Sequence, residues 1–311
     1  MDARRVADHL GIPHYVFDVE EEFTRDVVDD FVSEYAQGRT PNPCVRCNSN
    51  IKFRDLLRRG RALGCDGIAT GHYARMRHEP GELPALLRGV DREKDQAYFL
   101  WGLSPELLPL LHFPLGGQEK YEVRQRARTL CLVTADKPES QDICFVPMGD
   151  YRSFLETRLP PIHPALQPGK FVTTAGVVVG EHPGYAGFTV GQRRRLGGGF
   201  TEPFFVVEIR PKDREVVVGP YEELFSSHMT VQEVNWLVPV APAIGDQIQV
   251  QIRHRAPDVK GRVERIDREL KIQFEEPQQA VSPGQSAAIF KDDRLLGGGR
   301  ITSARRAKVT C

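Results

Sequence analysis

Residues 48–75, NSNIKFRDLLRRGRALGCDGIATGHYAR, carry the pattern of a helix followed by the pattern of a buried strand. Apolar residues at helical spacing predict a helix that begins at Asn48, a favourable N-cap, and ends at Gly64. The next residues are mostly apolar or small and predict a strand that breaks at Gly71. Because helices that alternate with buried strands are typical of parallel sheets, this segment predicts an α/β fold.

The flanking sequence extends this pattern in both directions. Upstream, residues 3–12 predict a helix, residues 14–19 (HYVFDV) a short buried strand, and residues 21–38 a long helix that ends at Gly38. Beyond residue 160 the helical pattern gives way to short alternating strands between Gly, Pro, Asp and Asn turns, which is typical of antiparallel β modules.

The predicted architecture is therefore a parallel-sheet domain of Rossmann type followed by two small antiparallel β modules, the last a β-barrel. We expect three domains, over residues 1–162, 163–228 and 229–311. The first should contain a ligand site, because ligands bind at the carboxyl ends of strands in open α/β sheets.

Composition excludes several classes of protein. The chain has 311 residues, 40% of them hydrophobic and 27% charged, and its 42 basic residues balance 42 acidic ones. No segment approaches the roughly 20 apolar residues of a membrane helix, and no secretory signal is visible, so we expect a cytoplasmic protein without a membrane anchor. Zero net charge argues against a non-specific nucleic-acid coat protein but allows local RNA contacts. Arginine clusters at 193–195, 253–255 and 305–306 are candidates for such contacts, or are simply solvated surface residues.

The six cysteines divide into two groups. Cys65 and Cys131 lie among apolar residues and predict buried core thiols, and Cys311 is the last residue. In a chain of this length without a secretory signal, the set does not form a disulfide framework. Cys44, Cys47 and Cys144 remain, each in an unusual setting.

Cys44 and Cys47 form a C-x-x-C pair between two prolines and a predicted helix (GRTPNPCVRCN, residues 38–48). A helix N-terminus stabilises a thiolate and lowers its pKa, which predicts reactive cysteines. Structural zinc and a thioredoxin-like redox site are alternatives. A zinc site needs four ligands, and the chain has no second pair of Cys or His residues at the spacing of a zinc ribbon. A thioredoxin-like motif would directly follow the first strand of the domain, and this C-x-x-C pair does not.

Three further segments carry polar residues at element ends. Gly71 and His72 end the strand predicted above, where a ligand would bind. Cys144 lies at the end of a short strand-like stretch between Pro138 and Pro147, facing a cleft or packed as a small core residue. Residues 91–96 (DREKDQ) form a charged loop that alone would predict only a solvated surface.

Taken together, the motifs are far more specific than any one of them. In its sequence the chain resembles the tRNA-specific 2-thiouridylases over almost its whole length, through these segments: 38–48 with IKF at 51–53, ATGHYAR (69–75), KDQAYFLWGL (94–103), KPESQDICF (137–145), FTVGQRRRLG (188–197) and VSPGQSA (281–287). The resemblance implies a fold of the adenine nucleotide alpha hydrolase type, in which residues 1–162 are an N-terminally truncated catalytic domain of ATP-pyrophosphatase type that carries both active cysteines.

It also implies the reaction. Such enzymes use ATP and Mg²⁺ to adenylate the C2 oxygen of the wobble uridine in the tRNAs for Lys, Glu and Gln. Sulfur then replaces that oxygen, delivered as a cysteine persulfide by a sulfur-relay protein or a cysteine desulfurase. By motif, Cys47 corresponds to the nucleophile and Cys144 to the persulfide carrier, and the two would form a transient disulfide.

Other roles follow from the same motifs. The resemblance assigns Gly71 to ATP and the following residues to tRNA: Asn42, Pro43, Cys44, His72, Lys94, Asp95, Gln96, Arg253, His254 and Gln285. A competing hypothesis is that Cys44, Cys47 and Cys144 ligate a [4Fe–4S] cluster whose open iron carries sulfide. The residues do not decide between persulfide and cluster.

One family motif is absent from the printed residues. The phosphate-binding loop SGGxDS does not occur, and the glycine triplets at 197–199 and 297–299 predict β turns instead. We therefore expect that the first strand and its loop are missing, through a misassigned start, a truncation, or a partner polypeptide that carries them. The alternative to a sulfurtransferase is an inactive fragment that binds tRNA.

Overall fold

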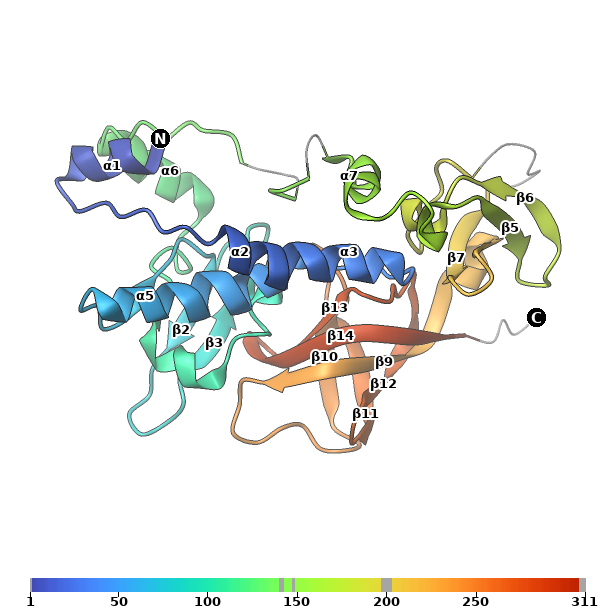
Figure 1. Cartoon of the computed structure of the whole chain (residues 1–311). Coiled ribbons are helices and arrows are strands. Elements are labelled where there is room, and N and C mark those ends of the chain that lie inside the picture. The colour runs from blue at the N-terminus through green and yellow to red at the C-terminus, as the bar shows by residue number, and fades with distance from the viewer. Residues whose placement is uncertain (1, 140–142, 147–148, 197–202, 308–311) are drawn as a thin grey trace.

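The computed structural model describes residues 2–139, 143–146, 149–196 and 203–307. Figure 1 shows helices along one side, a barrel below them and a smaller sheet at one end. The fold is mixed α/β, with a parallel strand pair and a closed C-terminal barrel, as the sequence predicts. The glycine triplet 197–199 lies outside the described residues.

Two long helical segments follow the first helix, α1 (Asp2–Leu10). The first comprises α2 (Glu20–Phe23), a π-helix (Thr24–Val28) and α3 (Asp29–Ala36), and it ends before Gly38, whose φ is +69°. The second comprises α4 (Pro43–Arg46), the π-helix η2 (Cys47–Asp55) and α5 (Leu56–Ala62), and it ends before Gly64, whose φ is +81°. Both glycine stops are confirmed, since glycine adopts positive φ without strain.

The start of the second segment differs from the prediction. Asn48 is not the N-cap; the segment begins at Pro43, whose ring fixes a helical φ in the first turn, and Asn42 precedes it. Cys44 and Cys47 therefore lie inside the first turns rather than before them. This correction matters because it places both thiols on a helix.

The strand predicted over residues 14–19 is wrong. This stretch has no regular structure, and Tyr15 and Val16 are exposed. A strand needs backbone partners, and within the described residues no strand pairs with it. The parallel pair of the N-terminal half consists instead of β1 (Ile68–Ala69) and β4 (Leu111–His112).

The C-terminal region is a closed barrel. Its strands are β9 (Phe225–Trp236), β10 (Gln247–Gln251), β11 (Val259–Ile266), β12 (Leu270–Gln279), β13 (Ser286–Lys291) and β14 (Arg294–Arg306). They pair in the order β13-β10-β11-β12-β9-β14, and the antiparallel pairing of β13 with β14 closes the ring. Gly297–Gly299 lies inside β14, so the predicted turn there is wrong. A Cβ on Gly298 would lie 2.7 Å from Trp101, so these glycines let other groups pack against the strand.

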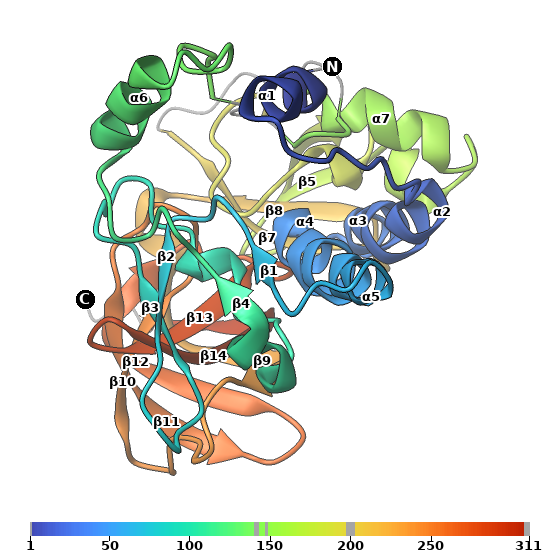
Figure 2. The ribbon, with the colours of Figure 1, turned by 90° about the vertical axis from the view of Figure 1, so that its left-hand side faces the viewer.

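A hairpin from the N-terminal half extends the barrel sheet. Strands β2 (Ala74–Arg77) and β3 (Ala85–Arg88) pair with each other, and β3 pairs with β14 at Leu87 and Arg294. The hydrophobic core is also continuous between the two parts, because Phe53, Leu100 and Leu111 share one apolar cluster with Phe290 of the barrel. The N-terminal half and the barrel are thus packed against each other (Figure 2).

The middle of the chain contains helices α6 (Lys120–Thr129) and α7 (Tyr151–Arg158) and a four-stranded sheet. The sheet has the order β6 (Val178–His182), β5 (Gly169–Thr173), β8 (Glu215–Gly219), β7 (Phe205–Arg210), and its β5–β8 pair is parallel. Short 3₁₀ turns complete the described elements, at Ala97–Phe99, Pro105–Leu110, Pro164–Leu166, Tyr185–Gly187 and Tyr221–Leu224. The three domain boundaries stay predictions.

Two cysteine predictions are wrong, since Cys65 and Cys131 are both exposed. Each follows the end of a helix, where the chain turns at the surface, so apolar neighbours in sequence did not bury them. Over the described part of the chain, no helix is long and apolar enough to cross a membrane.

Candidate functional site

A cavity of about 620 Å³ lies where the N-terminal half meets the barrel. Its walls come from the loop before α4, the end of β1, the loop over residues 91–96, the start of α6 and the barrel. Eight residues predicted for the site line it: Asn42, Pro43, Cys44, Gly71, Lys94, Gln96, His254 and Gln285. Cys47, Cys144, His72, Asp95 and Arg253 are not among the lining residues.

Cys44 and Cys47 lie on consecutive turns of the helix that borders the cavity, with Cys44 exposed and Cys47 half-buried. The predicted lowering of their pKa values is wrong. Desolvation by the surrounding protein raises the pKa of both thiols, and the charge of Cys144 raises it further. Ile143, the residue before Cys144, lines the same cavity as Cys44. Because burial disfavours the charged form of Cys44 and Cys47, a nearby positive charge is needed to form a thiolate.

Lys52 supplies such a charge, although no motif in the sequence marks it as a site residue. Its ammonium lowers the pKa values of Cys44 and Cys47, against the effect of burial. Lys52 follows Cys47 by five positions within the π-helix η2, whose hydrogen bonds join residues five apart. In an ordinary α-helix the neighbours of Cys47 are three and four positions away, so α-helical spacing does not pair Lys52 with Cys47.

The described residues give no support to a metal centre. No group of three His, Cys, Asp or Glu side chains among them is placed to hold a metal ion. Within these residues Cys44, Cys47 and Cys144 are therefore not grouped as the ligands of a [4Fe–4S] cluster.

Two predicted site residues hold the loop before α4 in place. The Gln285 amide donates hydrogen bonds to the carbonyls of Thr40 (3.0 Å) and Pro41 (3.3 Å). The Asn42 side chain hydrogen-bonds to the buried Tyr98, whose hydroxyl donates to the Ser286 carbonyl. Because Gln285 and Ser286 belong to the barrel side, the cysteine loop is fixed to the barrel.

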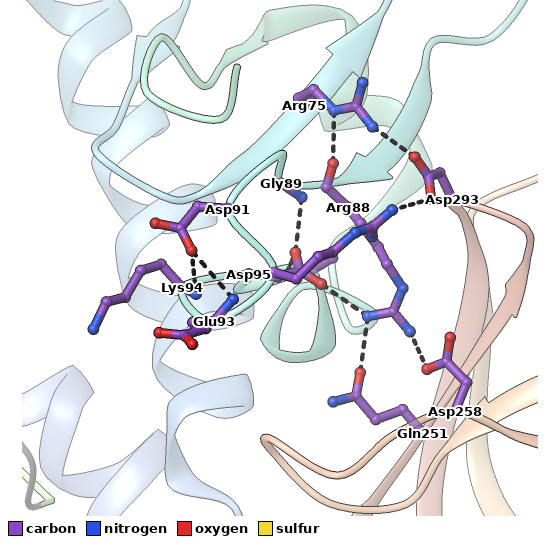
Figure 3. Close-up of polar contacts among 12 residues, drawn as sticks. Arg75, Arg88, Gly89, Asp91, Glu93, Lys94, Asp95, Gln251, Asp258 and Asp293 are labelled. Atoms are coloured by element: carbon purple, nitrogen blue, oxygen red, sulfur yellow. Dashed lines mark hydrogen bonds and ion pairs between the residues drawn. The ribbon is translucent and has the colours of Figure 1, made fainter. Parts of the chain in front are cut away.

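Asp95 faces inward, away from this cavity. Its carboxylate is 6% exposed, accepts hydrogen bonds from the backbone of Gly89 and Ala97, and pairs with Arg88 at 2.8 Å. Arg88 also pairs with Asp258 and donates to Gln251, both from the barrel (Figure 3). The Arg88 guanidinium lies 3.5 Å from the centre of the Phe290 ring. Asp95 thus helps to anchor the loop to the barrel.

Lys94 faces the opposite way and lines the cavity. In Figure 3 its ammonium group points away from the Arg88 network. The ammonium donates to the carboxylate of Glu139 at 3.0 Å, and this contact keeps the pKa of Glu139 below its usual value. Gln96 is tied to Tyr73 by two hydrogen bonds. Its side-chain oxygen accepts from the backbone N–H of Tyr73, and its own backbone N–H donates to the Tyr73 carbonyl.

Three basic side chains near the cavity are partly desolvated. His72 is 8% exposed, and burial lowers its pKa to about 4, so it is neutral at pH 7; its Nδ1 lies 2.8 Å from the Thr70 hydroxyl. Burial also lowers the pKa values of Arg253 and His254. Arg253 donates to the Gln279 carbonyl, and the His254 ring lies 4.5 Å from that of Phe99. An aromatic and imidazole wall of this kind can stack on a base.

Comparisons with known proteins cover nearly the whole chain. Residues 1–148 match a family described as the tRNA methyl transferase HUP domain, residues 152–220 its PRC-barrel domain, and residues 226–301 an aminomethyltransferase beta-barrel domain. Proteins named tRNA-specific 2-thiouridylase MnmA are similar in sequence. That of Carboxydothermus hydrogenoformans is 48% identical over 96% of this chain and 82% of its own length. That of Acidithiobacillus ferrooxidans is 46% identical over 96% of this chain and 85% of its own.

Proposed function

The chain belongs to the family of tRNA-specific 2-thiouridylases, and on this premise we propose that it is a tRNA-uridine 2-sulfurtransferase. Its substrates are then ATP and the wobble uridine of the tRNAs for Lys, Glu and Gln. Sulfur comes from a relay protein or a cysteine desulfurase. Both the family name and the motifs of the chain support this proposal.

The observation that carries the proposal is the position of the cysteines. Cys44 lines a cavity of about 620 Å³, Cys47 follows it on the same helical segment, and Ile143, the residue before Cys144, lines the same cavity. A cavity of several hundred cubic ångströms is the usual size for one small ligand, such as a single nucleotide. A uridine would have to leave the anticodon stack to reach it, as enzymes that modify bases require.

The reaction can be written with these residues. ATP adenylates the C2 oxygen of uridine and releases pyrophosphate. The terminal sulfur of a Cys144 persulfide then bonds to C2, and AMP leaves with the oxygen. The Cys47 thiolate attacks the Cys144 sulfur, the S–S bond to the transferred sulfur breaks, and 2-thiouridine and a Cys47–Cys144 disulfide result. A sulfur donor and a thiol reductant restore the enzyme.

In this scheme Lys52 favours the attacking thiolate, and Gln285 and Asn42 hold the cysteine loop beside the base. Gly71, at the end of β1, lines the cavity and is the proposed contact with ATP. Mg²⁺ would be bound mainly by the phosphates of ATP and would neutralise their charge. No step is assigned to an iron–sulfur cluster, because no described group of side chains is placed to hold one.

In vitro thiolation tests the proposal. Unmodified tRNA for Lys, ATP with Mg²⁺ and a persulfide donor are mixed without oxygen, and 2-thiouridine is measured by nucleoside mass spectrometry. Cys47→Ser and Cys144→Ser should abolish the product, whereas Cys65→Ser, at an exposed cysteine outside the cavity, should retain it. The printed chain is run beside a version extended at its N-terminus. If neither makes 2-thiouridine while tRNA still binds, the tRNA-binding alternative replaces the enzyme.

A further inference from the structure

A wide trough continues the cysteine cavity along helix α6. It has a volume of about 940 Å³ and shares Glu93, Lys94, Lys120 and Glu139 with that cavity. An extended ligand that places one unit beside Cys44 would therefore pass over these shared residues. The family resemblance assigned only Lys94 among them.

Three cations in the trough converge on one carboxylate. Glu139 lies 3.0 Å from the Lys94 ammonium, 3.5 Å from the Lys120 ammonium and 4.0 Å from the Arg124 guanidinium. These cations come from two separate elements, the loop over residues 91–96 and helix α6. Such an arrangement is the usual way in which proteins hold a phosphate group.

Asp91 fixes the two elements relative to each other. One of its oxygens accepts from the backbone N–H groups of Glu93 and Lys94, at 3.2 Å each, as Figure 3 shows. The other accepts from the N–H of Lys120, the first residue of α6, at 3.0 Å. The Asp91 side chain thus sets the spacing of the Lys94 and Lys120 backbones, so the cation cluster is built into the fold.

A ligand can replace Glu139 as the partner of Lys94, Lys120 and Arg124. The four side chains are 27–35% exposed, and ion pairs at such surfaces contribute little net stability. A phosphodiester, which also carries one negative charge, can replace the carboxylate without leaving a buried charge unpaired. Glu139 is therefore suited to hold the cations in the free protein and to release them to a ligand.

We propose that Lys94, Lys120 and Arg124 form a backbone-phosphate site for RNA, which Glu139 occupies in the free protein. This inference rests on the proposed function, because it takes tRNA as the ligand. RNA is favoured over the phosphates of ATP because the trough is open along α6 and continues past the cavity. Glu139 then acts as an internal competitor that lowers the affinity for RNA.

Binding of a fluorescently labelled tRNA anticodon stem–loop, followed by anisotropy, tests the competition. Glu139→Gln removes the competing charge and should tighten binding by about two- to fivefold. This is the change in affinity that corresponds to the free energy of a surface ion pair. The matched control is Asp136→Asn, which frees Arg128 from a 2.7 Å ion pair at the other end of α6. It makes the same change in net charge, and its affinity should stay close to that of the unaltered protein. Equal effects of both variants, or no effect of Glu139→Gln, would overturn the proposal.

Salt dependence supplies a second readout. Lys120→Met should weaken binding and reduce the slope of log affinity against log salt by about one, because one phosphate contact is lost. An unchanged slope contradicts the site even if Glu139→Gln proves poorly folded. ATP is titrated in parallel, and variants that alter ATP affinity but not RNA affinity would assign the cluster to the nucleotide.

The two proposals fail in different ways. If the unaltered protein binds the stem–loop and makes 2-thiouridine while the variants change nothing, only the phosphate site is refuted. If the protein neither binds the stem–loop nor makes 2-thiouridine, both proposals are refuted.

Discussion

The two sides of the loop over residues 91–96 carry ion pairs that differ in burial: those toward the barrel are buried, and those toward α6 are partly exposed. On the barrel side, Arg88 and Asp95 are 9% and 6% exposed, and their remaining polar contacts go to backbone N–H groups, to Gln251 and to Asp258. On the α6 side, Lys94 and Glu139 are 31% and 27% exposed and face an open trough. Neighbouring residues of one motif thus have different roles: Asp95 anchors the loop to the barrel, and Lys94 remains available to a ligand.

The difference follows from desolvation. A buried ion pair that loses one partner leaves a charge without water, whereas an exposed pair exchanges its partner for water or another ion. The barrel side should therefore govern stability, and the α6 side should govern binding. Four predictions test this division.

The largest effect is expected for Arg88→Met. It leaves the carboxylates of Asp95 and Asp258 without their shared cation, which should lower the free energy of unfolding by about 3–5 kcal/mol. Chemical denaturation measures this change. Arg92→Met, which removes an exposed arginine paired with Asp293, is the control and should cost less than about 1 kcal/mol. Similar losses for both variants would remove the basis of the comparison.

A buried, pH-sensitive group is expected beside the cysteine cavity as well, at His72. Its pKa is lowered from 6.5 to about 4, so the unfolded chain binds a proton more readily than the folded one. Its contribution is present above pH 6.5 and is lost as the pH falls toward 4, by about 3 kcal/mol in total. His72→Gln should flatten the fall in unfolding free energy between pH 7 and pH 4 relative to the unaltered protein. His14→Gln, at an exposed site, should leave the pH profile unchanged, and a parallel profile for His72→Gln would contradict the prediction.

Lys52→Met should alter reactivity rather than stability. Because the Lys52 charge lowers the pKa of Cys47, its removal should raise that pKa and shift the pH profile of thiol alkylation to higher pH. The rate at Cys47 is followed by mass spectrometry of the labelled peptide. Lys170→Met, on strand β5 of the central sheet, is the charge-matched control. An unshifted profile for Lys52→Met would remove Lys52 from the proposed mechanism.

Only a small effect on stability is expected for Glu139→Gln. The Glu139 ion pairs are at the surface, so the free energy of unfolding should change by no more than about 1 kcal/mol. Thermal and chemical denaturation both measure it. A loss as large as that of Arg88→Met would show that Glu139 is a structural anchor, and the two sides of the loop would then be alike.

Much of the fold was predictable because its signals are local. The helices end at Gly38 and Gly64, where positive φ is required, and the barrel follows from alternating strands and turn residues. The strand predicted at residues 14–19 failed because apolar character alone does not provide a hydrogen-bonding partner. The site was predictable in part, since motif order brought Cys44, Gly71, Lys94 and Gln285 to one cavity.

By itself, the sequence determined the family, the α/β order of elements and the cysteines on which a sulfur-transfer hypothesis depends. Only the tertiary structure decided that Asp95 is buried against Arg88 while Lys94 faces Glu139. It alone joined the β2–β3 hairpin to β14 and placed the Lys52 charge beside the thiols. The physical reason is that burial, strand pairing and pKa values depend on partners far away in the chain. Helix stops and turns depend only on a few neighbouring residues.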